Sequence, residues 1–314
     1  MTKNGKCLWI IDTLLQMNDG LSLRELNDRW ERSSLYDGKS LHERTFARYK
    51  DFIADEYNID ITYSVATNKY IIENAADIRS NALYRYLMSA YRVAGLNTQV
   101  LHHRERLMLE SVPTGTEHLE MLLQAIDEGR TVVFNYESYY SDKPQDWELI
   151  PCFLRIFEGR WYLVAEYIGR ERVKTYALER ITNLRIGYKN LTASPKIMPD
   201  KFYVGCYGII RKEIQAEMIL LRADKEQRRY LRAQPLHESQ KEVESGEDYS
   251  VFEYCLRPSF DLFQKILWMR DKVEIIGPAS VRAKFAELVG SIAGKYRDSA
   301  IAAADDISVE YIPQ

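Results

Sequence analysis

Basic and aromatic side chains are interleaved through a β-prone stretch in the middle of the chain, and together they suit the binding of phosphates and bases. Residues 155–185 hold seven Lys or Arg against four Glu. A guanidinium grips a phosphate with paired hydrogen bonds, and aromatic rings stack on exposed bases. The side chains that we expect to line this binding face are Tyr136, Ser138, Arg155, Trp161, Lys174, Tyr176 and Arg180.

A second basic cluster lies near the N-terminus, and its chemistry suits double-stranded DNA. Residues 39–50 hold four Lys or Arg against one Glu. The first residues of a helix in the major groove reach base edges, while nearby cations meet phosphates. The whole chain carries a net charge of −3, so any such surface is local. The predicted DNA-contacting residues are Lys39, His42, Arg44, Thr45, Arg48, Lys50 and Lys69.

The elements that must position this second cluster are three helices and a hairpin. Ser22–Glu25 and Ser40–Glu43 have the spacing of capping boxes, which start helices at about 23 and 41. The expected helices span 7–17, 23–34 and 41–56, and the hairpin 59–72. This order predicts a winged helix-turn-helix over residues 1–74. The alternative is a solvated charged face on an ordinary three-helix bundle. Glu43 either accepts a hydrogen bond from cytosine or caps the helix, and we favour the cap.

The first cluster is expected on a small barrel over residues 116–192. After a helical linker over 75–115 and a helix over 117–128, strands over 149–157 and 159–167 meet at Glu158-Gly159, and a third strand follows at 172–178. A proline-containing linker over 192–200 ends this segment. The alternative for the aromatic residues is a place in the core, and for Arg180 an ion pair with Glu179 or Glu166.

Strands and helices alternate over residues 210–300, which predicts a ferredoxin-like sheet with helices on one face. The fold class is therefore a multidomain α+β chain. His237 lies in an unusual loop of this last segment, 235–240. We favour a solvent-exposed turn for this histidine over a ligand contact across the domain boundary.

The middle segment resembles the WYL domain family. The residues that carry the resemblance are Trp161-Tyr162-Leu163, Tyr136, Leu149-Ile150-Pro151 and Tyr176-Ala177-Leu178-Glu179-Arg180-Ile181. The resemblance implies an Sm-like or SH3-like barrel that senses a ligand, often a nucleotide or nucleic acid, inside a bacterial transcription regulator. The family pattern supports Tyr136, Lys174 and Arg180 best as ligand contacts. Ala177 stands where the family often has a basic residue, which indicates a smaller or less charged ligand.

The segment Arg44-Thr45-Phe46-Ala47-Arg48 resembles the recognition helix of the same family. His42 and Glu43 stand where the family usually has small or basic residues, and Tyr49 stands where it often has an acid. These departures leave the preferred DNA sequence open.

The sequence offers no support for catalysis, a cofactor or a metal site. It contains no phosphate-binding glycine loop, no nucleophile elbow and no zinc-binding HExxH pattern. Its four cysteines, at 7, 152, 206 and 255, are far apart, which fits a reducing, cytoplasmic environment. We expect no secretory signal, because the apolar start is soon interrupted by Asp12, and no membrane span.

These patterns together predict a cytoplasmic transcription regulator that binds an operator in double-stranded DNA as a homodimer. A nucleotide or single-stranded nucleic acid would be its effector. One alternative is a sensor of nucleic acid without sequence preference, accessory to a defence or repair system. Another is an interaction module whose barrel binds protein.

Overall fold

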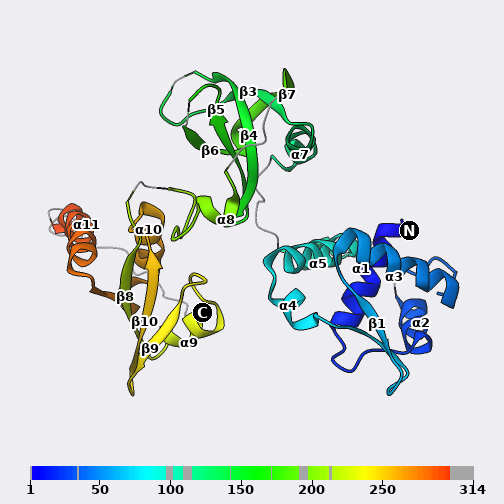
Figure 1. Cartoon of the computed structure of the whole chain (residues 1–314). Coiled ribbons are helices and arrows are strands. Elements are labelled where there is room, and N and C mark those ends of the chain that lie inside the picture. Colours follow the sequence, from blue (N-terminus) through cyan, green and yellow to red (C-terminus); the bar gives the residue numbers. More distant parts are fainter. Residues whose placement is uncertain are drawn as a thin grey trace. The chain divides into compact units, whose positions relative to one another are not determined.

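The computed structural model describes residues 2–33, 35–96, 102–108, 115–141, 143–170, 172–190, 197–211 and 214–297. The chain divides into two compact units, Met1–Glu110 and Ser111–Gln314, which we call the N-terminal and C-terminal units. Both units combine helices with β-sheet (Figure 1), so the predicted mixture of α and β elements in several parts is confirmed. The finer division into four segments remains a prediction.

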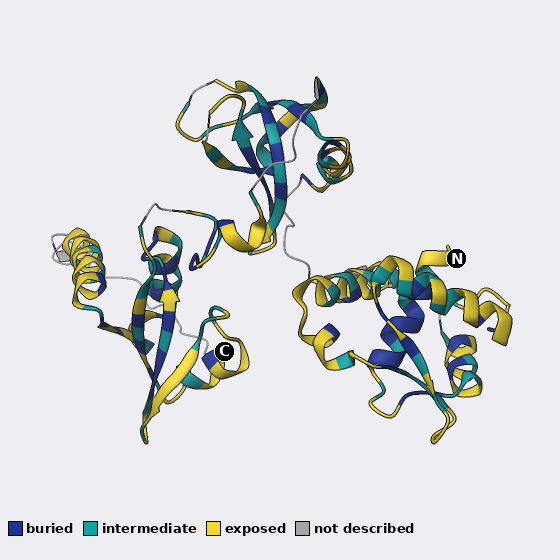
Figure 2. Ribbon diagram, viewed as in Figure 1, coloured by how far each residue is buried: buried dark blue, intermediate teal, exposed yellow. Residues whose placement is uncertain are grey.

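The N-terminal unit packs its helices around α1 and adds a two-stranded sheet. Figure 2 shows α1 as the most buried helix of this unit. Its core joins residues of every helix from α1 to α5. The elements are α1 (Lys3–Leu15), α2 (Leu23–Arg32), α3 (Glu43–Tyr57), β1 (Ile61–Ser64), β2 (Lys69–Ile72), α4 (Ala75–Ser80), α5 (Ala82–Gly95) and the 3-10 turn η1 (Arg104–Arg106).

One of the two predicted capping boxes is confirmed and the other is wrong. At α2, the Ser22 hydroxyl accepts the backbone N–H of Glu25, and the Glu25 carboxylate accepts the backbone N–H of Ser22 at 2.7 Å. At α3 the N-cap is His42, which makes no side-chain cap. Ser40 instead donates its hydroxyl to Glu31 at 2.8 Å, because the α2–α3 turn brings that carboxylate within reach. Glu43 is therefore the first residue of α3, and it is not half of a cap.

The hairpin β1–β2 is fastened to the turn that precedes α2. Leu21 and Tyr70 exchange two backbone hydrogen bonds, at 3.1 and 2.8 Å. Gly20 has a φ of +70°, and a Cβ at that position would lie 2.4 Å from the Tyr70 carbonyl oxygen. Only glycine fits this close approach without strain. The short connection therefore fixes the hairpin beside α2 and α3.

Two arginines tie α4 and α5 to α1. The Arg92 guanidinium donates from Nε to the Asp12 carboxylate at 3.0 Å, and Arg79 donates from Nε to the Leu15 carbonyl at 3.0 Å. Ile78 and Met88 complete the same core, with exposed fractions of 2% and 5%. These contacts make α4 and α5 part of the packed N-terminal unit.

The first half of the C-terminal unit is a five-stranded antiparallel sheet packed against α7. The strand order is β6-β5-β4-β3-β7. The β4–β5 connection at Glu158 and Gly159 has φ values of 46° and 75°, as a tight hairpin turn requires. The elements are η2 (Thr116–His118), α7 (Leu119–Asp127), β3 (Arg130–Tyr136), β4 (Gln145–Phe157), β5 (Arg160–Tyr167), β6 (Val173–Ala177), η3 (Leu178–Arg180) and β7 (Ile181–Asn190).

The predicted linker over 192–200 is only partly described. Residues 191–196 lie outside the described residues. Pro199 begins a short helix, α8 (Pro199–Phe202), so the end of the predicted linker is helical. Phe202 packs on Phe153 with ring centroids 5.8 Å apart and belongs to the same cluster as Val164. This helix therefore covers the side of β4 and β5 that faces away from α7.

The second half of the C-terminal unit is an antiparallel sheet of four strands in the order β11-β8-β10-β9. Its core joins the sheet to α9, α10 and the start of α11. The sequence patterns predicted three of these strands and missed β9. The elements are β8 (Glu217–Asp224), α9 (Gln227–Ala233), β9 (Lys241–Ser245), β10 (Tyr249–Leu256), α10 (Phe260–Trp268), η4 (Arg270–Lys272), β11 (Val273–Gly277) and α11 (Ala279–Arg297).

All four cysteines are unpaired thiols. Every helix among the described residues is too short or too polar to span a bilayer. Within the same residues, no group of three or more His, Cys, Asp and Glu side chains is arranged to hold a metal ion.

Candidate functional site

The turn between α2 and α3 is held by two side chains of α2. Asn27 acts as a backbone mimic: its amide donates to the Leu41 carbonyl at 2.9 Å and its carbonyl accepts the Leu41 N–H at 2.6 Å. Trp30 is fully buried and donates from Nε1 to the Lys39 carbonyl at 2.9 Å. These bonds fix the chain just before α3, so its first residues have a defined direction. Sequence reasoning placed Trp30 inward but missed Asn27, whose signal is a polar residue one helical turn before that buried tryptophan.

The first turns of α3 present the predicted DNA-contacting side chains to solvent. Arg44 and Arg48 are one helical turn apart and lie on the same exposed side of α3. Phe46 and Ile53, on the opposite face, are buried at 1% and 0% exposure. Neither arginine forms an ion pair among the described residues, so both guanidinium groups are available to an anionic partner. Of the seven predicted residues, those exposed in the structure are Lys39, His42, Arg44, Thr45 and Arg48.

Lys50 and Lys69 differ from the other five predicted residues because both are half-buried. The Lys50 ammonium lies 5.4 Å from the Tyr70 ring centroid. Lys69 is the first residue of β2, and its charge helps to lower the pKa of Glu25, after the larger effect of hydrogen bonds from Ser22. The structure thus places Lys69 on the hairpin, as predicted, and turns Lys50 toward the same hairpin.

A row of aromatic rings runs along one side of the core between α7 and the five-stranded sheet. Tyr176 lies at its middle, with ring centroids 5.0 Å from Tyr136 and 6.3 Å from Trp147. Trp147 in turn contacts Tyr167 at 5.3 Å. Burial raises the pKa of both Tyr136 and Tyr176. These phenols therefore stay neutral and add no negative charge beside the nearby cations.

Arg180 lies at one end of this row. Its guanidinium carbon is 4.8 Å from the Tyr136 ring and 3.6 Å from the Tyr139 ring, and Nε donates to the Glu137 carbonyl at 2.7 Å. The alternative of an ion pair with Glu179 or Glu166 is wrong: Arg180 forms no ion pair among the described residues, and Glu179 pairs with Arg160 at 3.3 Å. Arg180 therefore keeps its positive charge beside exposed aromatic surface.

Ser138 belongs to the turn next to Arg180 and shapes it. Its hydroxyl accepts the backbone N–H of Tyr140 at 3.2 Å. Tyr139 and Tyr140 of this turn are 79% and 100% exposed. Sequence reasoning missed both tyrosines, although two adjacent aromatic residues in a polar turn are a readable signal.

Lys174 lies at the other end of the aromatic row. Its ammonium is 5.9 Å from the ring centroids of both Trp147 and Tyr167. Arg172, which sequence reasoning missed, lies 5.6 Å from the Tyr167 ring. Lys174 and Arg172 are both exposed. The row thus has a cation at each end, an arrangement that suits an anionic ligand with aromatic rings.

The Trp161-Tyr162-Leu163 triplet is mainly structural. Leu163 is fully buried in the core that faces α7, and Trp161 packs against that same core. Tyr162 is buried on the opposite face, at 8% exposure. Tyr176 is only 2% exposed, so a base cannot stack on its ring. Trp161 and Tyr176 therefore belong mainly to the core, as the alternative assignment predicted.

Arg155 contacts residues other than those that surround Lys174 and Arg180. Its guanidinium carbon stacks 3.7 Å from the Tyr203 ring, beside a pocket of about 390 Å³ that His237 also lines. His237 is half-buried, so the prediction that it lies in a solvent-exposed turn is wrong. Burial lowers the pKa of its imidazole. The seven predicted ligand-binding residues therefore do not form one cluster.

Comparison with protein families identifies the five-stranded segment. Residues 117–186 match the model of the WYL domain. This match confirms the resemblance predicted from the Trp161-Tyr162-Leu163 triplet and its flanking residues. The matched range covers α7 and most of the five-stranded sheet.

Two of the solved structures that match the chain show weak overall similarity. Proteasome accessory factor B/C (PafBC) of Arthrobacter aurescens is 17% identical with a TM-score of 0.37, over 93% of this chain and 47% of that one. The chain therefore spans about half the length of PafBC. A CRISPR Cas-related protein is 13% identical with a TM-score of 0.36, over 94% of this chain and 85% of that one. Likenesses of this strength carry no functional conclusion. No curated protein matches the chain.

Proposed function

We propose that this chain, which carries a WYL domain at residues 117–186, is a transcription regulator. Its N-terminal unit would bind double-stranded DNA, and its WYL segment would bind an effector that alters this binding. The observation that supports the proposal best is the start of α3. There Arg44 and Arg48 are exposed and form no ion pair with any residue that the structure describes, on a helix whose start is fixed by Asn27 and Trp30.

The order of elements in the N-terminal unit supports a winged helix-turn-helix. In such a domain the second helix of the pair enters the major groove, and its first residues meet base edges. Helix α3 would take this role, and the β1–β2 hairpin would be the wing, with Lys69 near the backbone. Glu43 does not cap α3, and its side chain is exposed at the first position of this helix. It would therefore be free to accept a hydrogen bond from a cytosine amino group.

The C-terminal unit supports the remaining parts of the proposal. The β3–β7 sheet would form the small barrel expected of a WYL domain. The four-stranded sheet has the strand order fourth, first, third, second with two intervening helices. This order supports the proposal of a ferredoxin-like domain, whose elements follow the order βαββαβ. We also propose that the protein acts in the cytoplasm without a catalytic role, a proposal that the resemblance to bacterial regulators supports.

Regulation would follow from a homodimer with two arrangements. Two recognition helices bind adjacent major grooves only when they stand about 34 Å apart, one turn of the duplex. An effector shifts the balance between arrangements by its difference in affinity for them. An effector on the WYL segment would thus change the fraction of dimers with the correct spacing.

The test of sequence-specific binding is selection from a pool of random duplexes with the full chain. We expect enrichment of an inverted repeat whose half-sites are about 10 base pairs apart, centre to centre. The complex with the selected duplex should survive roughly a thousandfold excess of random duplex. A pool that stays random after repeated rounds would contradict the proposal.

A second candidate function is a nucleic-acid sensor without sequence preference. The observation in its favour is that Arg180 lies beside the exposed ring of Tyr139 and Lys174 beside the half-buried ring of Tyr167, because single strands are commonly held by rings and cations together. Random duplex would then compete as well as any selected sequence. Binding would also fall steeply with salt, since phosphate contacts release counterions.

Substitution of Lys174 tests the effector site. With the single strand dT10 as the probe, we expect Lys174→Ala to weaken binding by roughly tenfold, the value of one charge-assisted hydrogen bond. Because Lys174 is exposed, thermal unfolding should be unchanged. Duplex binding by α3 should also remain. Fluorescence anisotropy of labelled dT10 measures the affinity.

Arg170→Ala is the matched control, because Arg170 is an exposed cation on the β5–β6 turn of the same sheet. It removes the same charge and should leave dT10 binding within about twofold, as expected for a cation that makes no direct contact. Equal losses in both variants would show that only net charge matters. The assignment of Lys174 to a site would then be wrong.

A further inference from the structure

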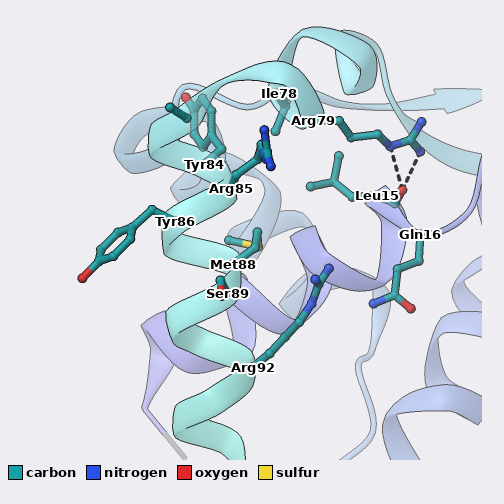
Figure 3. Close-up of a pocket in the computed structure, with 11 residues that line it drawn as sticks. Leu15, Gln16, Ile78, Arg79, Tyr84, Arg85, Tyr86, Met88, Ser89 and Arg92 are labelled. Carbon is teal, nitrogen blue, oxygen red and sulfur yellow. Dashed lines mark hydrogen bonds between the residues drawn. The ribbon is translucent and has the colours of Figure 1, made fainter. Parts of the chain in front are cut away.

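The N-terminal unit contains a groove that the proposed DNA and effector surfaces do not use. It lies between the C-terminal end of α1, α4 and α5 and has a volume of about 680 Å³. Small-molecule sites commonly measure about 300–1,000 Å³. Its floor is apolar, and Figure 3 shows the side chains of Leu15, Ile78 and Met88 grouped there.

The rim of the groove is positively charged. Three arginines line it, and no acidic residue does so among the described residues. Arg92 is neutralised by Asp12, whose carboxylate accepts two hydrogen bonds from it. Within the described part of the chain Arg79 donates only to a carbonyl, that of Leu15, so no carboxylate there compensates its charge. Arg85 is exposed and forms no ion pair among the described residues.

The positions on α5 explain why these charges gather at one place. Arg85 and Arg92 are two helical turns apart, so they extend from the same side of the helix. Figure 3 shows Arg92 reaching from α5 toward α1 and Arg85 lying near Ile78, with Met88 and Ser89 between the two arginines. A ligand in the groove would therefore meet apolar carbon below and guanidinium groups beside it.

We propose that this groove binds a small amphipathic anion, such as a carboxylate or sulfonate attached to an apolar body. The apolar body lies on Leu15, Ile78 and Met88, and the anionic group accepts hydrogen bonds from Arg85 and Arg79. Guanidinium groups pair well with such oxygens, and burial of apolar carbon adds to the affinity. An extended peptide is the less favoured occupant, because stable peptide contacts usually need a larger surface than this groove offers.

Such a ligand would join α1, α4 and α5 and so strengthen the contact that Arg79 and Arg92 already make. This site is separate from the effector site of the WYL segment. The inference does not depend on DNA binding, because the groove would bind its ligand in the free protein.

The experiment uses the full chain without DNA and follows the fluorescence of 8-anilinonaphthalene-1-sulfonate. We expect one class of bound dye that Arg85→Glu weakens roughly tenfold or more, because a charge-assisted hydrogen bond is replaced by repulsion. Arg85→Lys should retain most of the affinity. Octanoate should displace this dye, and octanol, which has the same chain without the charge, should displace it far less.

Arg24→Glu is the matched control, since Arg24 is an exposed arginine on α2 of the same unit. It should leave dye binding unchanged, and both variants should melt at the temperature of the parent protein. Unchanged dye affinity in Arg85→Glu would overturn the proposal, as would equal displacement by octanol and octanoate. So would Arg85-dependent binding of a hexaglutamate peptide that octanoate does not displace, which would identify a peptide-docking surface.

Discussion

Replacement of Arg44 and Arg48 together by alanine is expected to abolish specific duplex binding and to leave the stability of the protein unchanged. Each bidentate contact between an arginine and a base contributes about 1–3 kcal/mol of discrimination. The loss of two such contacts reduces affinity by roughly 30-fold or more. Both side chains are exposed and without ion pairs among the described residues. Surface substitutions of this kind usually change stability by less than about 0.5 kcal/mol.

The measurement is an electrophoretic shift with the selected duplex, paired with a thermal melt. Arg170→Ala combined with Arg229→Ala is the control, because it removes two exposed arginine charges from the C-terminal unit. That double variant should bind the duplex normally. Retention of tight, specific binding by the Arg44 and Arg48 double variant would show that α3 is not the recognition helix.

Trp30→Ala should unfold or severely destabilise the N-terminal unit while the C-terminal unit remains folded. Trp30 is fully buried, and its ring lies 4.9 Å from that of Trp9 and 6.0 Å from that of Tyr36. Truncation of such a side chain to alanine costs about 3–5 kcal/mol. The bond from Nε1 to the Lys39 carbonyl is lost as well. A single domain is stable by only about 5–15 kcal/mol, so this loss is a large fraction of the whole.

Hydrogen exchange of the full chain separates the two units in this experiment. We expect fast exchange in α1, α2 and α3 of the Trp30→Ala protein and unchanged protection in β3–β7. Trp30→Phe should restore most of the stability but not the bond to Lys39, so its defect should be confined to the α2–α3 turn. Trp268→Ala is the control, since this tryptophan is 72% exposed and should be dispensable for folding. Full protection of α1–α3 in Trp30→Ala would contradict the role assigned to Trp30.

Local signals in the sequence predicted most elements correctly. Ser22 and Glu25 cap α2 because both partners lie within one turn of the chain, where no other contact competes. The Glu158-Gly159 turn was predictable because a tight hairpin favours glycine where φ is positive. The amphipathic face of α3 was equally readable, since Phe46 and Ile53 follow the helical repeat.

Tertiary contacts explain the errors. Ser40 has the spacing of a cap, yet its hydroxyl bonds to Glu31, nine residues away. Strand β9 was missed because all of its residues, Lys241–Ser245, are exposed and carry no alternating apolar signal. The division of the helical region into α4 and α5 at Asn81 also went unpredicted, although asparagine is a common N-cap and accepts the Leu83 N–H here.

The candidate site was harder to predict than the fold. Periodicity assigns residues to strands but does not show which side chains meet across them. Arg180 and Tyr136 do lie together, because η3 ends at Arg180 and the next residue, Ile181, pairs with Tyr136. Arg155 was grouped with them wrongly, since it stacks on Tyr203, a residue that follows α8 and lies far along the chain. Such pairings depend on how the chain folds back, which no local pattern encodes.

The hydrogen bonds by which Arg79 and Arg92 join α4 and α5 to α1 also affect how the chain folds during its synthesis. Arg79 reaches back 64 residues to Leu15, and Arg92 reaches back 80 residues to Asp12. Contacts between such distant residues slow folding, because a long loop must close before they form. During synthesis the contacts of α1 with α4 and α5 therefore form only after α5 has left the ribosome. A nascent chain that pauses shortly after the hairpin would leave exposed the part of α1 that later packs against α5, and this surface would offer a binding site to chaperones.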